Sequence, residues 1–292
     1  MTFSITDCIT HISKHPDNVV GWGPRFLAED LIGYMDQERT VLGETVRIDQ
    51  SVVFPALGDT VPTSPLSPEQ AHEYVLESVE RHPDRLIGGF VANPRRWNDD
   101  VADWFLEHAR AGRFRMMHLH PSLHLFLLPI DSPSEGATYR RLIFPLFEAA
   151  REANVPVYLN MGDPPYGVPS TADFVARSFP DVKIIVGHVG TQGMTFTFDA
   201  SLLAKRHDNI LLESSFGQYH LLIEIVASLG ADRLLFGSNT PPNEQTQQLM
   251  MVDKSLASPM PLGIGVSDED MHKIYGGNLR TLLGLDSARV AA

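Results

Sequence analysis

Residues 182–191 read Val-Lys-Ile-Ile-Val-Gly-His-Val-Gly-Thr, and this stretch decides the predicted fold. A short apolar run that ends in a histidine between glycines is typical of a buried strand in a parallel sheet, which delivers one polar side chain at its carboxyl end. Strict strand alternation would put Ile184, Val186 and His188 on one face. We therefore expect the two aliphatic side chains to fill an interior and His188 to lie at its rim.

Other segments repeat this plan, with helical stretches between them. The expected strands cover residues 4–11, 47–55, 86–93, 114–120, 155–160, 182–188, 209–215 and 233–239. Strands and helices in alternation indicate a parallel sheet. Eight strands in 292 residues fit one (β/α)8 barrel, which takes about 250 residues. The chain is thus predicted to be an α/β protein, with residues 1–292 forming a single TIM-barrel domain.

The predicted helices carry their own start signals. Ser67 is followed by a proline in the first turn and by Gln70, which together form a capping box. Ser170 and Ser267, each with an aspartate three positions later, follow the same rule with a shorter acid. We therefore expect helices to begin after each of these three serines.

Composition and charge narrow the classes of function. A net charge of -13 disfavours nucleic acid and anionic membranes as partners, and no apolar run approaches the roughly 18 residues of a membrane span. Cys8 is the only cysteine, which excludes an intramolecular disulfide and fits a reducing cytosol. Alternation puts Cys8 opposite to Ile9, so we do not expect it to be a nucleophile. With no secretion signal at the start, we expect a cytoplasmic protein that acts on a small molecule.

Histidines gather at the predicted carboxyl ends of the strands. His11 ends the first strand and His188 the sixth. The fourth strand ends in Met-His-Leu-His, which puts His118 and His120 on one face. Such a pair suits a shared metal ion or acid-base chemistry. The plainer alternatives are a lone His11 bonded to a loop carbonyl and two solvated histidines ahead of a proline.

Neutral and acidic side chains complete the predicted polar ring. Asn160 ends the fifth strand and Asn239 the eighth, where an amide donates and accepts hydrogen bonds but cannot act as a base. The seventh strand ends in Glu-Ser-Ser, and alternation leaves open whether Glu213 or Ser214 points inward. Trp22, in the loop after the first strand, is predicted to cover a planar substrate.

These segments, in this order, resemble the amidohydrolase superfamily. Within it they resemble the amidohydrolase-related group that contains aminocarboxymuconate-semialdehyde decarboxylase, benzoate decarboxylases and pyrone-dicarboxylate lactonase. The resemblance covers nearly the whole chain. Its most specific pieces are Gly-His-x-Gly at residues 187–190 and Phe-Gly-Ser-x-x-Pro at residues 236–241. It implies the barrel fold, hydrolase or decarboxylase chemistry and pairing as a homodimer.

The resemblance also implies a metal site. The family builds it from two histidines of an Asp-x-His-x-His strand, a histidine ending the fifth strand, one ending the sixth, and an aspartate ending the eighth. At these positions the chain keeps Asp7, His11 and His188, and it has Ile9, Asn160 and Asn239 in place of two histidines and the aspartate. Isoleucine has no donor atom and asparagine is a weak neutral ligand, so we expect a degenerate site that does not hold zinc tightly.

Our first hypothesis is therefore an enzyme, a metal-independent hydrolase or decarboxylase without a cofactor, acting on a small polar, carboxylated substrate. His188 or His118 would be the base, because an imidazole titrates near neutral pH. The catalytic set is completed by His11 and by Asn239, which would polarise a carbonyl or hold a carboxylate. The residues expected to bind substrate are His120, Asn160, Glu213 and Trp22.

Two alternatives stay open. In one, a zinc ion is held at a relocated site by histidines from the set His11, His118, His120 and His188. In the other, the barrel is catalytically inactive and binds a ligand or another subunit. The joint absence of the acidic base and of two metal ligands is the pattern expected of a barrel that has lost its catalytic activity.

Overall fold

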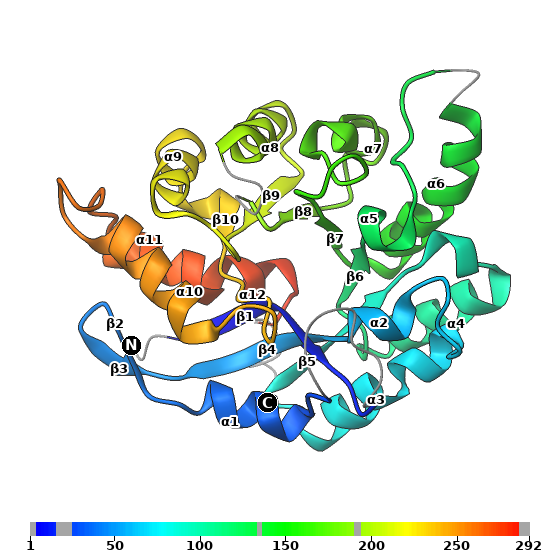
Figure 1. The fold of residues 1–292 in the computed structure, drawn as a ribbon, viewed down its shortest axis with the longest axis horizontal. Helices are drawn as coiled ribbons and strands as arrows, with labels where there is room; N and C mark the ends of the chain where they lie inside the picture. Colours follow the sequence, from blue (N-terminus) through cyan, green and yellow to red (C-terminus); the bar gives the residue numbers. More distant parts are fainter. Residues whose placement is uncertain (1–3, 16–24, 133–135, 190–193, 286–292) are drawn as a thin grey trace.

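The computed structural model describes residues 4–15, 25–132, 136–189 and 194–285 (Figure 1). Eight strands form one sheet in the order β1-β4-β5-β6-β7-β8-β9-β10, and every pair of neighbours is parallel. The strands are β1 Ile5–Ile12, β4 Ile48–Pro55, β5 Leu86–Val91, β6 Met116–Leu119, β7 Val157–Asn160, β8 Ile184–Gly187, β9 Ile210–Glu213 and β10 Leu234–Leu235. All eight predicted strands are present.

The sheet closes on itself through main-chain hydrogen bonds between the first strand and the segment that follows the last. The Cys8 N–H donates to the Phe236 carbonyl over 3.0 Å, and the Asn239 N–H donates to the Ile9 carbonyl over 2.9 Å. The β10 strand itself is short because this segment continues as a loop along β1. The predicted TIM barrel is therefore confirmed.

Helices surround the sheet, as the ring of coils in Figure 1 shows. They are α1 Ala28–Met35, α2 Leu57–Thr60, α3 Pro68–Arg81, α4 Asp99–Arg110, α5 Pro121–His124, α6 Gly136–Ala153, α7 Asp173–Ser178, α8 Met194–Arg206, α9 Tyr219–Leu229, α10 Gln245–Val252, α11 Asp268–His272 and α12 Asn278–Leu282. The described residues also form short 3-10 or π helical turns, which are η1 Pro94–Arg96, η2 Pro169–Ala172, η3 Ala231–Arg233, η4 Asp253–Ala257 and η5 Lys273–Gly277. Among the described residues, no helix has the length and apolar character that crossing a membrane requires.

Two of the three predicted helix starts are confirmed. The Ser67 hydroxyl accepts from the Gln70 N–H over 3.2 Å, and the Gln70 side chain accepts in return from the Ser67 N–H over 2.9 Å. Ser267 likewise caps α11. The expected start after Ser170 is wrong, because Ser170 lies within the η2 turn and its N–H donates to the Asp199 carboxylate instead.

A short antiparallel hairpin was not predicted from the sequence. Its strands are β2 Arg39–Val41 and β3 Glu44–Val46. The turn between them has left-handed backbone at both residues, with φ of 53° at Leu42 and 77° at Gly43. Leucine is no turn signal, and the conformation is held by a long-range contact in which the Leu42 N–H donates to Asp253 over 3.0 Å.

The strands bury side chains on two sides. The barrel interior is filled by Cys8, Ile9, Val52, Phe54, Ile87, Val91, Met116, Tyr158, Ile185, Leu211, Leu235, Leu279 and Leu283. Ile184 and Val186 lie in the larger cluster between the strands and the helices. The expectation that these two residues fill the interior is therefore wrong, and Ile185 takes that place.

The expected separation of Cys8 and Ile9 is also wrong, since both belong to the interior cluster. The register of β1 against β4 shifts between Asp7 and Thr10, and this irregularity breaks the alternation of side chains. Cys8 is fully buried and packs among the apolar side chains of the interior.

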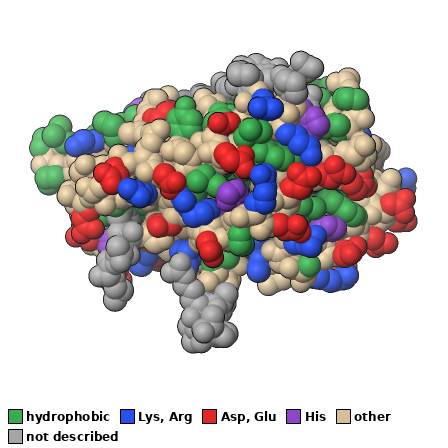
Figure 2. All heavy atoms as spheres, turned by 90° about the horizontal axis from the view of Figure 1, so that it is seen from below, with side chains coloured by type: hydrophobic (Ala, Val, Ile, Leu, Met, Phe, Trp, Pro, Cys, Tyr) green, Lys and Arg blue, Asp and Glu red, His purple; other side chains and the backbone are tan. Residues whose placement is uncertain are grey.

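Acidic and basic side chains are interspersed over the face of the molecule shown in Figure 2.

Candidate functional site

The carboxyl ends of the parallel strands meet at one end of the barrel, which we call the mouth. His188 follows β8 and Asn239 follows β10, and both have left-handed backbone, with φ of 58° and 57°. Such a residue leaves the strand alternation. His188 therefore reaches the mouth even though Ile184 and Val186 point the other way, and the sequence argument placed this histidine correctly for the wrong reason.

His11, at the end of β1, is held from two sides. Its Nδ1 donates to the Pro55 carbonyl over 3.1 Å, and its Nε2 lies 3.2 Å from Oδ1 of Asn239. Burial is the main cause that lowers the pKa of His11 to about 4. At neutral pH this imidazole is therefore uncharged.

His118 lies at the floor of the mouth and is fully buried. Neither of its ring nitrogens has a hydrogen-bond partner. Its ring is 6.0 Å from that of His11, 5.1 Å from Phe54 and 5.0 Å from Tyr158, measured between centroids. Burial lowers its pKa well below the usual value, with the neighbouring histidines as a smaller cause. The structure thus leaves two buried nitrogens of a neutral imidazole without a partner.

His120 and His124 extend this row of rings. The His120 Nδ1 accepts from the Leu123 N–H over 3.3 Å and so caps α5, and its ring lies 6.0 Å from that of His118. His124 was not among the predicted site residues, because it belongs to the loop beyond the strand. The turn of α5 brings it within 6.4 Å of His120, and its Nε2 lies 3.3 Å from the Thr60 hydroxyl.

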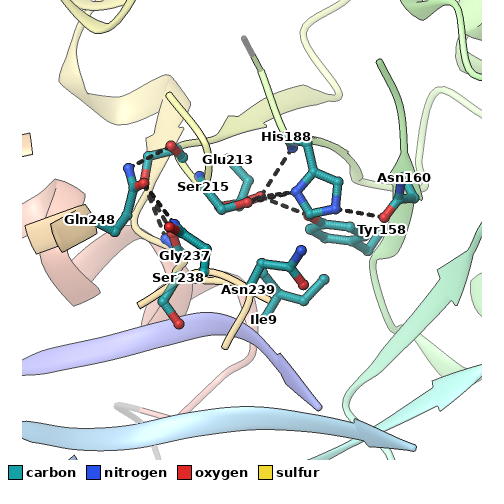
Figure 3. A network of polar contacts seen from close by, with 12 residues as sticks. Ile9, Tyr158, Asn160, His188, Glu213, Ser215, Gly237, Ser238, Asn239 and Gln248 are labelled. Carbon is teal, nitrogen blue, oxygen red and sulfur yellow. Dashed lines mark hydrogen bonds and ion pairs between the residues drawn. The ribbon is translucent and has the colours of Figure 1, made fainter. Parts of the chain in front are cut away.

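His188 is bound at both ring nitrogens (Figure 3). Its Nδ1 lies 2.6 Å from the Ser215 hydroxyl, and its Nε2 lies 2.6 Å from Oδ1 of Asn160. The Asn160 amide in turn donates to Asp163 over 3.4 Å. Burial lowers the pKa of His188 to about 3, so this ring too is neutral at pH 7.

Glu213 lies beneath His188 rather than at the open surface of the mouth (Figure 3). It is fully buried, and its carboxylate accepts from the Tyr158 hydroxyl over 2.7 Å and from the Ser215 hydroxyl over 2.8 Å. Burial raises its pKa. Glu213 and Ser215 thus point inward, whereas the Ser214 hydroxyl lies against Gly237. The alternation left open in the sequence is settled in this way.

Asp7 ties the first strand to the last. Its carboxylate accepts from the Ser238 N–H over 2.9 Å, from the Ser238 hydroxyl over 2.6 Å and from the Gln245 amide over 3.2 Å. Burial raises the pKa of Asp7 to about 6. Because Asn239 follows Ser238, this network fixes the position from which Asn239 meets His11. Trp22 lies outside the described residues.

A protein-family model described as amidohydrolase matches residues 6–285. The chain belongs to the amidohydrolase family. The predicted resemblance to this superfamily is confirmed, and so is the expectation of an enzyme at the level of the family. No curated protein matches the chain.

Solved structures with the same barrel include enzymes of aromatic acids. A 2,6-dihydroxybenzoate decarboxylase from Rhizobium is 14% identical, with a TM-score of 0.64 over 98% of this chain and 100% of the other. A manganese-bound 5-carboxyvanillate decarboxylase from Novosphingobium aromaticivorans is 13% identical, with a TM-score of 0.63 over 97% and 96%. A probable 2-pyrone-4,6-dicarboxylic acid hydrolase from Acinetobacter baumannii is 13% identical, with a TM-score of 0.58 over 96% and 99%. At these identities the likeness shows the fold.

The expectation that the chain has no cofactor is wrong in the light of these structures. The carboxyvanillate decarboxylase contains manganese on the same barrel, so a divalent metal ion is the cofactor that the fold points to.

We therefore tested whether the residues of the chain fit such an ion. Within the described ranges, no group of three or more His, Cys, Asp or Glu is arranged to hold a metal. Both nitrogens of His11 and of His188 already meet oxygen atoms of the protein. His118 offers one unmatched ring, where a zinc site takes about three or four protein ligands. The residues do not fit a resident ion at the family's position.

Proposed function

We propose that the chain is a hydrolase or carbon–carbon lyase that acts on a small carboxylated aromatic substrate at the mouth of the barrel. The amidohydrolase family match supports this reaction class. The structural relatives are named for dihydroxybenzoate, carboxyvanillate and pyrone dicarboxylate, which are all small planar acids. The mouth of this chain is lined by flat rings, with Phe54 and His118 edge to face at its floor, which suits a planar ligand.

The observation that carries the proposal is the pair of unmatched nitrogens on His118. A buried polar group without a partner costs about 1–3 kcal/mol, and such groups in native proteins call for an explanation. A bound substrate would explain the unmatched nitrogens of His118, because the neutral ring can donate one hydrogen bond to it and accept another from it. A carboxylate or phenolate accepts the first, and a hydroxyl group donates the second.

The residues around His118 have separate roles in acid-base chemistry and in substrate binding. His118 and His188 are the acid-base pair. Both nitrogens of His118 are unmatched, and His188 exchanges a proton at Nε2 once the substrate displaces the Asn160 amide. A neutral imidazole takes a proton from water or a phenol and returns it to carbon or to a leaving group. The amide of Asn239, held beside His11, binds a substrate oxygen. His120 and Asn160 flank the ring of the substrate. This division rests on their places at the mouth.

A substrate panel tests the proposal. Purified protein is incubated with dihydroxybenzoates, 5-carboxyvanillate and pyrone dicarboxylate, with and without added manganese, and the products are separated by chromatography. We expect turnover of at least one planar acid and its loss, by about 10²- to 10⁴-fold, in His118→Gln. Absence of both binding and turnover across the panel would overturn the proposal.

The purified protein used in this panel also tests the two alternative functions, an inactive binding barrel and a relocated zinc site. Binding of an acid without turnover under any condition would favour the inactive barrel. One equivalent of zinc in the purified protein, lost in His118→Gln, would favour a relocated metal site.

A further inference from the structure

The ring of His188 is held on its Nδ1 side by a set of buried polar groups. Its Nδ1 lies 2.6 Å from the Ser215 hydroxyl, which in turn donates to Glu213 over 2.8 Å. Ser215 and Glu213 are both fully buried. Figure 3 shows this chain of contacts running from the interior of the barrel up to His188.

The direction of these hydrogen bonds follows from counting protons. A serine hydroxyl has a single proton, and that of Ser215 is directed to the Glu213 carboxylate. The Ser215 oxygen therefore meets Nδ1 with a lone pair, and on the other side of the ring Nε2 faces Oδ1 of Asn160, which is also an acceptor. A neutral imidazole has one ring proton and can donate to only one of the two, so Ser215 and Asn160 compete for it. Removing the Ser215 hydroxyl should move the proton to Nε2. The second histidine contact, from its main-chain N–H to the same Glu213 oxygen over 3.2 Å, fixes the backbone at this point as well.

Glu213 is itself held rigidly. Its carboxylate accepts from the Tyr158 hydroxyl and from the Ser215 main-chain N–H, in addition to the contacts above. These donors come from β7, from the residue after β8 and from the residues after β9, so that three neighbouring strands share one carboxylate.

Two glycines make room for this arrangement. A Cβ atom at Gly187 would lie 2.0 Å from the Tyr158 hydroxyl, and one at Gly237 would lie 2.2 Å from a Glu213 carboxylate oxygen. No real side chain tolerates such distances. The glycines of the two motifs Val-Gly-His and Phe-Gly-Ser are thus required by the buried tyrosine and glutamate.

We propose that Ser215, anchored by Glu213, is a positioning residue that fixes the orientation of the His188 imidazole and draws its single ring proton towards Nδ1, in competition with Asn160 at Nε2. The inference rests on the proposed function, in which His188 takes part in acid-base chemistry. It gives Glu213 a supporting place beneath the histidine, where the sequence suggested contact with substrate.

The test compares two neighbouring serines. Ser215→Ala removes the hydroxyl that meets His188, whereas the matched control Ser214→Ala removes a buried hydroxyl that lies against Gly237. The first readout is nitrogen-15 NMR of the histidine side chains, with the His188 signals assigned by their loss in His188→Gln. We expect the same share of protonated Nδ1 in the wild type and in Ser214→Ala, and a smaller share, with Nε2 protonated instead, in Ser215→Ala.

The second readout is steady-state kinetics on the substrate found in the panel above. Ser215→Ala should lower kcat by about 10- to 100-fold with KM changed little, because a misplaced catalytic group affects the chemical step. Ser215→Thr, which keeps the hydroxyl, should recover most of the loss if it folds. The NMR measurement needs no substrate, so failure of the proposed function leaves it intact. An unprotonated Nδ1 in the wild type, or equal effects of the two alanine variants on kcat, would overturn the inference.

Discussion

The imidazole of His118 and the phenyl ring of Phe54 meet edge to face at the floor of the mouth, with 5.1 Å between centroids and an angle of 71°. Tyr158 meets the same imidazole at 82°. An aromatic hydrocarbon would fit these neighbours as well as a histidine does. The chain therefore keeps a polar ring in a place where an apolar one would be more stable, which is expected of a functional residue.

His118→Phe should accordingly stabilise the protein while removing its activity. We expect the free energy of unfolding to rise by about 1–2 kcal/mol, since two unmatched nitrogens are lost from the interior. Turnover and binding of the planar acid should disappear. Urea unfolding and calorimetric titration measure the two effects.

His72→Phe is the matched control. His72 is equally buried, but its Nδ1 donates to the Pro68 carbonyl over 2.6 Å and its Nε2 accepts from the Val91 N–H over 2.8 Å. Losing those bonds should destabilise the fold by about 1–3 kcal/mol. Destabilisation of similar size in both variants would show that His118 is an ordinary structural histidine.

The glycine before His188 offers a second prediction. In Gly187→Ala the new methyl group would lie 2.0 Å from the Tyr158 hydroxyl, within a barrel that has no space to yield. We expect a loss of about 1–3 kcal/mol or more in the free energy of unfolding. Gly33→Ala on α1, where no atom lies within 4 Å, should be neutral or stabilising by up to about 1 kcal/mol. An equal response to the two substitutions would contradict this account of the interior.

Much of the fold was predictable because each strand is a short aliphatic run that ends in a polar residue. The predicted runs are too long at their ends. The eighth was expected over residues 233–239 but pairs as a strand only at Leu234–Leu235. Beyond that point the backbone follows β1 as a loop, held by the Asp7 network. Pairing of this kind depends on a partner far away in the sequence, which local patterns do not report.

The sequence predicted that His11, His118 and His120 lie close together, but not how the histidines are held. Histidines at strand ends were enough to assemble the mouth. Alternation then failed at His188 and Asn239, because both have left-handed backbone that non-glycine residues rarely adopt. It failed again at Cys8, where the strand register shifts. His124 was expected in the loop and outside the ring, and its place near His120 depends on the turn of α5. These features are set by tertiary contacts.

The buried histidines predict how stability responds to acid. Burial lowers the pKa of His11 to about 4 and that of His188 to about 3, against about 6.5 for a free histidine. As pH falls from 6.5 towards these values, the unfolded chain takes up protons that the folded chain does not. Each such histidine then costs about 1.4 kcal/mol of stability per pH unit.

Buried carboxyl groups act in the opposite sense. Asp7 and Asp59, with pKa values raised to about 6, bind a proton in the folded state between about pH 4 and 6 and so add stability as pH falls. Burial raises the pKa of Glu213 as well, so this carboxyl acts in the same direction. Lowered pKa values are found for six buried histidines, His11, His72, His118, His120, His124 and His188. The histidines outnumber the raised carboxyls, so the urea midpoint should fall between pH 7 and pH 5, and less steeply in His118→Phe. A urea midpoint that rises as pH falls from 7 to 5 would show that the lowered histidine pKa values do not dominate the pH dependence of stability.

The closure of the barrel depends on Asp7, and its removal should show this directly. Asp7→Ala leaves the buried main-chain N–H and hydroxyl of Ser238 and the amide of Gln245 without their acceptor. Unmet donors of this kind cost about 1–3 kcal/mol each. The cost is reduced because burial already disfavours the charged carboxylate at neutral pH. We expect a net loss of about 2–4 kcal/mol, together with faster hydrogen exchange at Cys8 and Asn239, whose N–H groups bond across the seam. Asp208→Ala, at a fully exposed carboxylate, is the control and should change neither. If hydrogen exchange at Cys8 and Asn239 stayed as slow as in the wild type, Asp7 would not be needed to close the barrel. The main-chain hydrogen bonds between β1 and the segment after β10 would then be sufficient.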